Sequence, residues 1–499
     1  MTQQAHPSYT KQRRLHNGKI ILNLFLKGKP MQKFIGRKAE LAALEESWNR
    51  PGFQMTVIYG RRRIGKSSLI REFIKNRRAI YFAAIRSGFS KNMERLGREV
   101  LKVLNPGSSS LGFPDLDTML TYTGRECREE RTVLVIDELP YLAEADPSFL
   151  SVLQNYIDGE WADSQIFLIL CGSSVSFMEN EVLSAKSPLF GRRTSQIRLD
   201  VFNYLEAAEF VPDYTREEQA IVYGVTGGVA WYLSLFDPQK NLDENISALF
   251  FRRQGYLYEE PENLLAQEFR NTAIYSDIIS SIASGCCRLH EISSKTHLDP
   301  ASVSYALKNL IATGIASKET AITDEKNRKK VQYVLKDSMF RFWYQFIPDA
   351  VGAIEMDEGD AYYQNIVRPR LPEYMGKVFE DICRFYTLKI GLKGELNCYV
   401  TSVGRWWGTN PHKKQPTDID VVGLDTRTGK AVLGECKFRN TPLDKKMYED
   451  LTDRNGLISH QYVTVQYLLF SKSGFSDWIH ENTDPEMVRL ISLEEMYLL

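Results

Sequence analysis

The sequence predicts a multidomain protein in which two α/β domains flank a smaller helical unit. Between about residues 34 and 235, short apolar runs typical of buried parallel strands alternate with amphipathic helical patterns. Residues 268–346 then show three helical patterns followed by two short strand patterns, and α/β patterning returns from 372 to 499. A chain of 499 residues is too long for one hydrophobic core, and its length favours about three domains.

The composition is that of an ordinary globular protein, with 43% hydrophobic and 25% charged residues. Because 63 basic residues balance 63 acidic ones, net charge neither supports nor excludes a nucleic-acid partner. No apolar run has the length of a membrane helix, and the short run at 20–26 is a poor secretory signal. Seven cysteines without metal-binding spacing fit reduced thiols, so we expect a cytoplasmic location and no membrane partner.

Changes in composition suggest five segments. Residues 1–30 are polar and basic, then apolar, and are either an N-terminal arm or a stretch upstream of the native start. We expect a nucleotide-binding domain with a helical lid, a helical unit with a hairpin, an acidic linker and a second α/β domain, at residues 31–260, 261–350, 351–371 and 372–499.

The first α/β domain contains a complete phosphate-binding motif. Residues 60–67 read GRRRIGKS, which matches G-x-x-x-x-G-K-[ST], and they lie between a predicted strand and a predicted helix. Gly60 and Gly65 would let backbone N–H groups close around the phosphates of a nucleotide. Lys66 would bridge the β- and γ-phosphates, Ser67 would ligate magnesium, and Ser68 completes the predicted set. The expected cofactors are therefore ATP and Mg²⁺.

A second apolar strand pattern, residues 133–136, ends in two carboxylates, Asp137 and Glu138. Asp137 is predicted to hold magnesium directly or through water, and Glu138 to orient and activate the attacking water. A solvated strand end is the simpler alternative, but the phosphate-binding motif upstream favours an ATPase site.

The strand pattern at 166–170 is followed by Cys171, Gly172, Ser173 and Ser174. Either serine could lie beside the two carboxylates and sense the γ-phosphate. A helix cap before the next helical segment is the alternative interpretation.

Four motifs taken in order resemble the prokaryotic archaeal-type ATPases of the AAA+/STAND branch. They are FIGRKAEL at 34–41, the two nucleotide motifs, the Gly-Ser-Ser strand end and SPLFGRRT at 187–194. The resemblance covers most of the chain from Met31. It implies a P-loop AAA+-like ATPase fold in which one strand lies between the two strands that carry the nucleotide motifs. It also implies an adenine pocket edged by Gly36 and Arg37.

The same resemblance implies that Arg192 or Arg193 acts as an arginine finger or sensor for the transferring phosphoryl group. A salt bridge to a neighbouring acid is an equally weighted alternative. A finger acting in trans would require a homo-oligomer. One departure concerns residues 226–230, TGGVA, where relatives tend to carry a proline after the two glycines. This departure affects how the segment would report nucleotide state.

The helical unit resembles a winged helix-turn-helix. Its predicted recognition helix, residues 301–313, would expose side chains able to bond bases or phosphates, namely Ser302, Ser304, Tyr305, Lys308 and Asn309. The charged wing loop, residues 326–330, could contact phosphates. DNA is therefore the expected partner, and a lid or interaction module without DNA contact is the alternative.

The last domain carries carboxylates on two adjacent predicted strands. Asp418 and Asp420 share one strand face, and Glu435 and Lys437 share a face of the next strand. Two carboxylates can hold Mg²⁺ or Mn²⁺ while a lysine positions or deprotonates water.

With Glu380 on a preceding helix, this order resembles the PD-(D/E)xK nuclease fold, a restriction-endonuclease-like α/β domain. The resemblance implies Glu380, Asp420 and Glu435 as metal ligands and Lys437 as a catalytic residue. Asp420 is preferred to Asp418 because such families normally place the ligand second. Degenerate forms of this fold bind without cutting.

Taken together, the sequence predicts an ATP-binding and hydrolysing protein coupled to DNA binding and to metal-dependent phosphodiester cleavage. The alternative is a nucleotide-gated regulatory switch that binds DNA or protein without cutting. A transcription factor with a vestigial last domain is a third interpretation.

Overall fold

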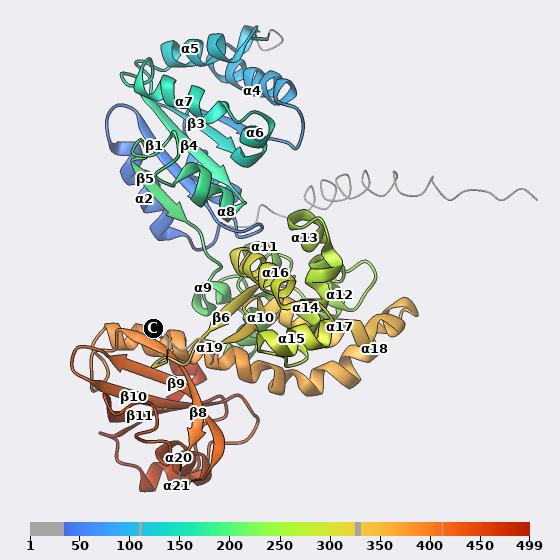
Figure 1. The fold of residues 1–499 in the computed structure, drawn as a ribbon, viewed down its shortest axis with the longest axis vertical. Helices are drawn as coiled ribbons and strands as arrows, with labels where there is room; N and C mark the ends of the chain where they lie inside the picture. The colour runs from blue at the N-terminus through green and yellow to red at the C-terminus, as the bar shows by residue number, and fades with distance from the viewer. Residues whose placement is uncertain (1–33, 109–111, 325–330, 412) are drawn as a thin grey trace, which may run out of the picture. The chain divides into compact units, whose positions relative to one another are not determined.

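The computed structural model describes residues 34–108, 112–324, 331–411 and 413–499 (Figure 1). The chain divides into two units, Met1–Arg37 and Lys38–Leu499, and each is described by itself. Within the described residues, no helix has the length and apolar character needed to cross a membrane.

The first sheet of the second unit has five parallel strands in the order β2-β3-β4-β1-β5. Every residue of β1, β3 and β4 is buried, which explains their continuous apolar runs. The strand before the phosphate-binding motif, β1, and the strand that ends in Asp137, β3, are separated by one strand, β4. The expectation that one strand lies between the two motif-bearing strands is therefore confirmed. The strands are β1 (Gln54–Tyr59), β2 (Ala79–Ala83), β3 (Thr132–Asp137), β4 (Ile166–Gly172) and β5 (Ser195–Arg198).

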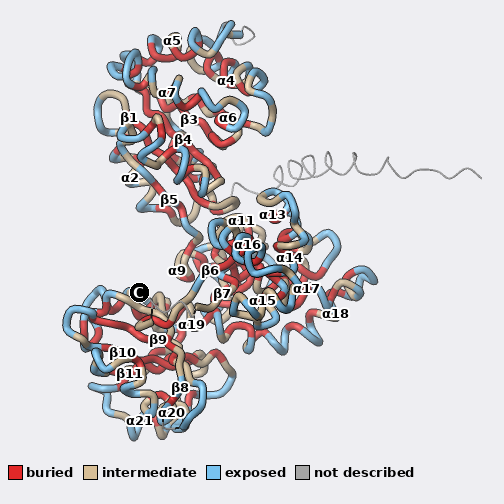
Figure 2. Tube along the Cα trace, in the orientation of Figure 1, coloured by how far each residue is buried: buried red, intermediate tan, exposed pale blue. Residues whose placement is uncertain are grey.

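Helices connect these strands, as parallel pairing requires. Buried residues on one face of the sheet and on the helices that cover this face form one hydrophobic cluster, and buried segments are drawn in red in Figure 2. The helices are α2 (Lys38–Asn49), α3 (Lys66–Ile74), α4 (Phe89–Leu104), α5 (Leu116–Glu126), α6 (Leu139–Ala145), α7 (Phe149–Asp158) and α8 (Val175–Phe177), with η1 (Pro106–Ser108) and η2 (Met178–Val182).

A run of helices follows the sheet, and local sequence fixes where several of them begin. Asn203, Thr215 and Asn241 each precede a helix by one residue and each has a glutamate three residues later, which forms a capping box. The helices are α9 (Tyr204–Ala208), α10 (Arg216–Thr226), α11 (Ala230–Leu233), α12 (Leu242–Phe250) and α13 (Glu260–Glu268).

Three more helices and a two-stranded antiparallel sheet come next, in the order that the sequence predicts. Asp299 caps the third helix by accepting hydrogen bonds from the backbone of Ala301 and Ser302, and Pro300 occupies its first position. The predicted wing loop at 326–330 lies outside the residues that the structure describes. The elements are α14 (Thr272–Ala283), α15 (Leu289–Thr296), α16 (Pro300–Ala312), β6 (Ala316–Glu319) and β7 (Gln332–Leu335).

The stretch that we interpreted as an acidic linker, 351–371, is largely helical. Tyr363 and Val367 in this stretch are fully buried in the core, and Asp360 pairs with Arg252. The overall polar composition of 351–371 therefore indicated a linker, although several of its residues pack into the core. The helices are α17 (Ser338–Glu355), α18 (Gly359–Tyr362), η4 (Tyr363–Val367), η5 (Arg368–Arg370) and α19 (Leu371–Leu392).

The last sheet is mixed, with strand order β12-β11-β10-β9-β8. β8, β9 and β10 pair antiparallel, whereas β10, β11 and β12 pair parallel. Helix α19 packs on β8, β9 and β10. The elements are β8 (Ser402–Asn410), β9 (Gln415–Asp425), β10 (Lys430–Lys437), β11 (Val463–Ser471), β12 (Val488–Ser492), α20 (Lys445–Thr452), α21 (Asp477–Asn482) and α22 (Leu493–Met496).

Gly228, in the segment that departs from the expected proline pattern, is tightly enclosed. Its φ is +69°, and a Cβ at this position would lie 2.0 Å from the carbonyl oxygen of Phe202. We expect Gly228→Ala, measured by thermal unfolding, to lower the free energy of unfolding by more than the roughly 1–3 kcal/mol that a non-glycine residue costs in the left-handed region. Gly52→Ala is the control, because Gly52 also has positive φ (+72°) but no described heavy atom lies within 4 Å of the added Cβ. Equal losses in the two variants would contradict this account.

Candidate functional site

The P-loop, residues 60–67, connects β1 to α3. Gly60 has a φ of +150° and approaches Leu199 so closely that a Cβ would lie 2.3 Å from its carbonyl oxygen. Gly65 is left-handed (φ +94°) and directly precedes Lys66, the first residue of α3. The loop therefore leads into a helix N-terminus, where backbone N–H groups and the helix dipole favour an anion.

Lys66 is buried against its own loop. Its Nζ donates hydrogen bonds to the carbonyl oxygens of Gly60 (2.7 Å) and Arg61 (2.8 Å). Burial lowers the pKa of this amine. These contacts hold the ammonium group against the backbone of the loop, and its bridging of the β- and γ-phosphates stays a prediction.

Strand pairing brings the predicted magnesium ligands together. Asp137 ends β3, and its Oδ2 accepts hydrogen bonds from the hydroxyls of Ser67 (2.7 Å) and Tyr81 (2.5 Å). Hydroxyl and carboxylate oxygens are ligands that Mg²⁺ prefers, so the donor set fits this ion. Ser68 is exposed in the first turn of α3. Tyr81 was not predicted, although its strand was, because nothing local marks which strand side chains face Asp137.

Glu138 has an unusual backbone conformation, with φ +55° in the left-handed region. Such strain in a non-glycine residue persists where the surroundings impose it, often at functional sites. Its Oε2 accepts a hydrogen bond from the Ser173 hydroxyl (2.8 Å). Of the two candidate serines, the structure thus brings Ser173 to the acidic pair. Within the described chain, the Ser174 side chain makes no cap hydrogen bond to α8.

Arg192 and Arg193 have partners outside the P-loop. Arg192 makes two hydrogen bonds to the Asp158 carboxylate (2.6 and 2.7 Å), which is the salt-bridge alternative. Arg193 donates to the carbonyl oxygen of Leu183 (3.0 Å) and stacks near Phe190. The finger or sensor role of either residue stays a prediction.

Gly36 and Arg37 belong to the first unit, and both are left-handed, with φ of +68° and +56°. Their predicted contribution to an adenine pocket stays a prediction.

The second carboxylate cluster lies on the last sheet. Val421 of β9 pairs with Gly434 of β10 in antiparallel register. Asp420, one residue before Val421, therefore lies beside Glu435, one residue after Gly434. Asp420 accepts a hydrogen bond from the backbone N–H of Cys436 (3.1 Å). Lys437 Nζ donates to Glu435 Oε1 (2.5 Å), and Arg454, which sequence reasoning missed, donates to Glu435 Oε2 (2.7 Å).

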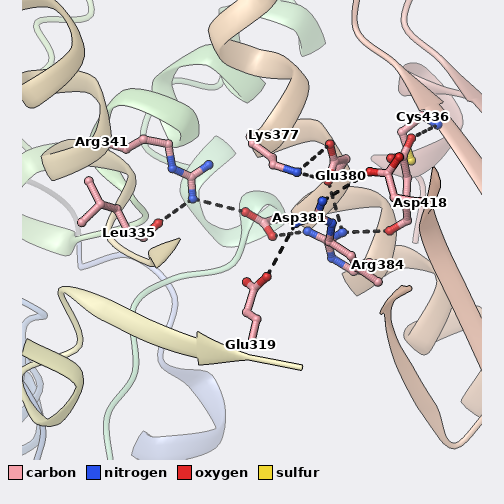
Figure 3. Close-up of polar contacts among 11 residues, drawn as sticks. Glu319, Leu335, Arg341, Lys377, Glu380, Asp381, Arg384, Asp418 and Cys436 are labelled. Atoms are coloured by element: carbon pink, nitrogen blue, oxygen red, sulfur yellow. Dashed lines mark hydrogen bonds and ion pairs between the residues drawn. The ribbon is translucent and has the colours of Figure 1, made fainter. Parts of the chain in front are cut away.

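Glu380 approaches this cluster from α19 (Figure 3). It pairs with Lys377 (3.0 Å) and Arg384 (3.4 Å). Arg384 also donates to the backbone carbonyl of Asp420 (2.8 Å), which links the helix to β9. Asp418, the competing candidate, instead pairs with Arg405 at 3.3 Å.

Burial and mutual repulsion perturb these carboxylates. Burial, followed by the charge of Asp420, raises the pKa of Glu380, and burial, followed by the charge of Glu435, raises the pKa of Asp420. Burial is the largest single influence on Lys437 and would lower its pKa, but the charge of Glu435, the hydrogen bond to it and the charge of Asp420 together raise the pKa. Such crowded carboxylates suit a cation.

A metal site is not preassembled in this cluster. Among the described residues, no three or more His, Cys, Asp or Glu side chains stand close enough together to hold a metal ion. Both carboxylate oxygens of Glu435 are engaged by Lys437 and Arg454. The oxygen ligands therefore fit Mg²⁺ or Mn²⁺ chemically, but at least one ion pair must open before Glu435 can join Asp420.

Comparison with known proteins identifies the family. Residues 34–236 match an ATPase domain found predominantly in Archaea, and residues 343–454 match a family of archaeal and bacterial proteins of unknown function. An ATP-binding protein of Methanocaldococcus jannaschii is 44% identical over 45 residues, which are 9% of this chain and 76% of that protein. The chain belongs to this archaeal-type ATPase family.

A longer relative extends the similarity beyond the ATPase domain. An uncharacterised protein of the same organism is 29% identical over 443 residues, 88% of this chain and 95% of that protein. Membership of the family establishes an α/β P-loop domain and implies that it binds nucleotide.

Two solved structures are also similar. The Walker-type ATPase of Pyrococcus abyssi has a TM-score of 0.47 and 19% identity, over 63% of this chain and 97% of its own. The ORC2 protein of Aeropyrum pernix, in ADPNP–ADP complexes, has a TM-score of 0.42 and 14% identity, over 65% and 97%. At these scores the similarities add nothing to the family assignment.

Removing the buried charge of Asp420 should change how stability depends on pH. Because the folded state raises the pKa of Asp420, the protonated carboxyl is favoured at low pH, and stability is lost as pH rises through that pKa. We expect Asp420→Asn to stabilise the protein by an amount on the order of 1 kcal/mol at pH 8. The gain should shrink towards pH ~4, near the unfolded pKa of about 3.9.

Thermal unfolding between pH 4 and pH 8 measures this difference, with the exposed Asp163→Asn as the control. A gain that does not vary with pH, or a loss at pH 8, would contradict the assigned electrostatics.

Proposed function

We propose that this archaeal-type ATPase hydrolyses Mg²⁺-ATP at the P-loop and couples hydrolysis to DNA binding. The observation that carries the proposal is the convergence of the residues that follow three strands, β1, β3 and β4: Ser67 bonds to Asp137, and Ser173 bonds to the adjacent Glu138. Seven free cysteines accord with the cytoplasmic location that we propose for this activity.

Each residue has a distinct part in the proposed reaction. Lys66 and the backbone N–H groups of the loop hold the phosphates. Mg²⁺, held by Ser67 and Asp137, would neutralise charge on the β- and γ-phosphates. Glu138 accepts the proton of the attacking water, and Ser173 orients its carboxylate through the 2.8 Å hydrogen bond.

The exposed face of α16 supports DNA as the partner. Ser302, Ser304 and Lys308 are exposed, and Tyr305 is 69% exposed, although a tyrosine of this size is usually packed. Asn309 differs, because it donates a hydrogen bond to Tyr275 (2.8 Å). We propose that α14 to α16 with β6 and β7 form a winged helix-turn-helix that presents this face to DNA.

The cluster on the last sheet favours a second candidate function, metal-dependent phosphodiester cleavage in a PD-(D/E)xK-like domain. Asp420 and Glu435 lie on adjoining strands, and Lys437 bonds to Glu435 at 2.5 Å. A metal held by Asp420 with Glu435 or Glu380 would polarise the phosphate, while Lys437 positions or deprotonates the water. The ion pairs that occupy Glu435 favour the alternative, a nucleotide-gated switch that does not cut.

We expect Lys66→Ala to lose both ATP binding and hydrolysis, because the phosphates lose their cationic partner. We expect Glu138→Gln to retain binding while kcat falls by about 100- to 10,000-fold, the usual contribution of a general base. Calorimetry and phosphate release measure the two properties, and Glu94→Gln, on the exposed surface of α4, is the control. Wild-type turnover in Glu138→Gln would contradict the assignment of the base.

For the second candidate, we expect wild-type protein with Mg²⁺ or Mn²⁺ to cleave supercoiled plasmid or single-stranded DNA, and Lys437→Ala to lose this activity. Reactions with and without ATP show whether nucleotide controls cutting. Lys445→Ala is the control, because its exposed side chain pairs with Glu449 away from the cluster. If the wild type hydrolyses ATP but cuts neither substrate, the non-cutting switch is the correct function.

A further inference from the structure

Three arginines occupy x positions of the P-loop motif, and each pairs with an acidic residue that comes after the first sheet in the sequence. Phosphate binding by such a loop needs only backbone groups, lysine and a hydroxyl, so these contacts serve another purpose. The pairs are Arg61 with Asp337 (2.6 Å), Arg62 with Glu268 (2.8 Å) and Arg63 with Glu260.

Arg62 differs from its neighbours because it also approaches the proposed general base. Its Nε donates to Glu268 Oε1 (2.8 Å), its Nη2 donates to the Tyr141 hydroxyl (3.1 Å), and its Nη1 lies 3.9 Å from Glu138 Oε1. The side chain is 23% exposed. Burial alone would lower its pKa, but Tyr141, Glu268 and Glu138 together raise it, so the guanidinium stays charged.

We propose that Arg62 is a positioning residue for ATP hydrolysis, which holds the Glu138 carboxylate in place and is itself oriented by Glu268. This inference rests on the proposed ATPase function. Ser173 restrains one oxygen of Glu138 at 2.8 Å, and Arg62 lies beside the other. Without the guanidinium, the carboxylate would have one restraint and could turn away from the attacking water.

The contacts of Arg62 also explain how a distant segment can set the rate. Glu268 is the last residue of α13. A small pocket beside Ser173 is lined by Arg61, Arg62, Glu268, Ala312 and Thr313. Ala312 is the last residue of α16, the helix that we propose faces DNA, and Thr313 follows it as the C-cap. A shift of α13 would therefore reach Glu138 through Glu268 and Arg62, without a change in the phosphate cradle, and the end of α16 lines the same pocket.

The test separates kcat from KM in the full-length chain. We expect Arg62→Ala to lower kcat by about 10- to 100-fold, while KM and the dissociation constant for Mg²⁺-ATP change by less than about twofold. Arg62→Lys should not restore kcat, because a lysine cannot contact Glu268 and Glu138 at once. The control is Arg98→Ala on α4, where the exposed arginine pairs with Glu94.

Glu268→Gln provides a variant that keeps the P-loop sequence intact. We expect it to lower kcat less than Arg62→Ala does, and the double variant to be no slower than Arg62→Ala alone, because both act through one contact. A lower kcat in the double variant than in Arg62→Ala would overturn the link to Glu268.

Binding of ADP with aluminium fluoride and Mg²⁺, a mimic of the transferring phosphoryl group, gives a readout without turnover. We expect Arg62→Ala to weaken this complex by about the factor lost in kcat. An unchanged kcat in Arg62→Ala would overturn the proposal, as would an equal loss of affinity for ATP itself, which would make Arg62 a phosphate ligand. A wild-type protein without turnover would instead refute the proposed function, and the proposal would fall with it.

Discussion

The nucleotide site depends on the parallel pairing of β1 with β4 and of β4 with β3. This order places the loop after β1 and the carboxylates after β3 at the same edge of the sheet, where the Ser67 hydroxyl reaches Asp137 at 2.7 Å. One residue of slippage in a fully buried strand would turn its side chains to the opposite face, so the buried core fixes the register. Glu138, directly after β3, has a left-handed backbone conformation. The chemistry of the site is thus a consequence of how the sheet is buried.

Charge pairing then connects this site to the helices that follow. Asp337 is fully buried, accepts hydrogen bonds from the first turn of α17 and pairs with Arg61. Removing one partner of a buried ion pair costs about 3–5 kcal/mol, so these contacts restrain the loop strongly. Arg62 adds a contact to Glu138, directly after β3. The P-loop therefore has two connected functions, since its backbone is suited to phosphates and its side chains bind the region beyond the first sheet.

Much of this arrangement could be predicted from the sequence, and the physical reason is locality. Lys66 and Ser67 are fixed by one loop and one helix start, and Asp137 by the end of an apolar strand, so short motifs suffice. Glu268 lies 206 residues from Arg62, and no local pattern marks it as a partner. The same limit applies to two arginines of the second cluster, because Arg454 after α20 reaches Glu435 of β10, and Arg384 on α19 reaches Asp420 of β9. The helical stretch at 351–371 was missed because the acidic run at 355–360 dominates its composition, whereas the buried Tyr363 and Val367 come after that run.

The most direct test of the central claim is how magnesium affects ATP affinity, measured by calorimetry on wild type and Asp137→Asn. If Asp137 and Ser67 form the magnesium site, Mg²⁺ should strengthen ATP binding to the wild type. It should have little effect on Asp137→Asn, while the affinity without metal stays similar in both proteins. The same strengthening by magnesium in both proteins would contradict the account, because the ion would then bind ATP without the strand-end carboxylate.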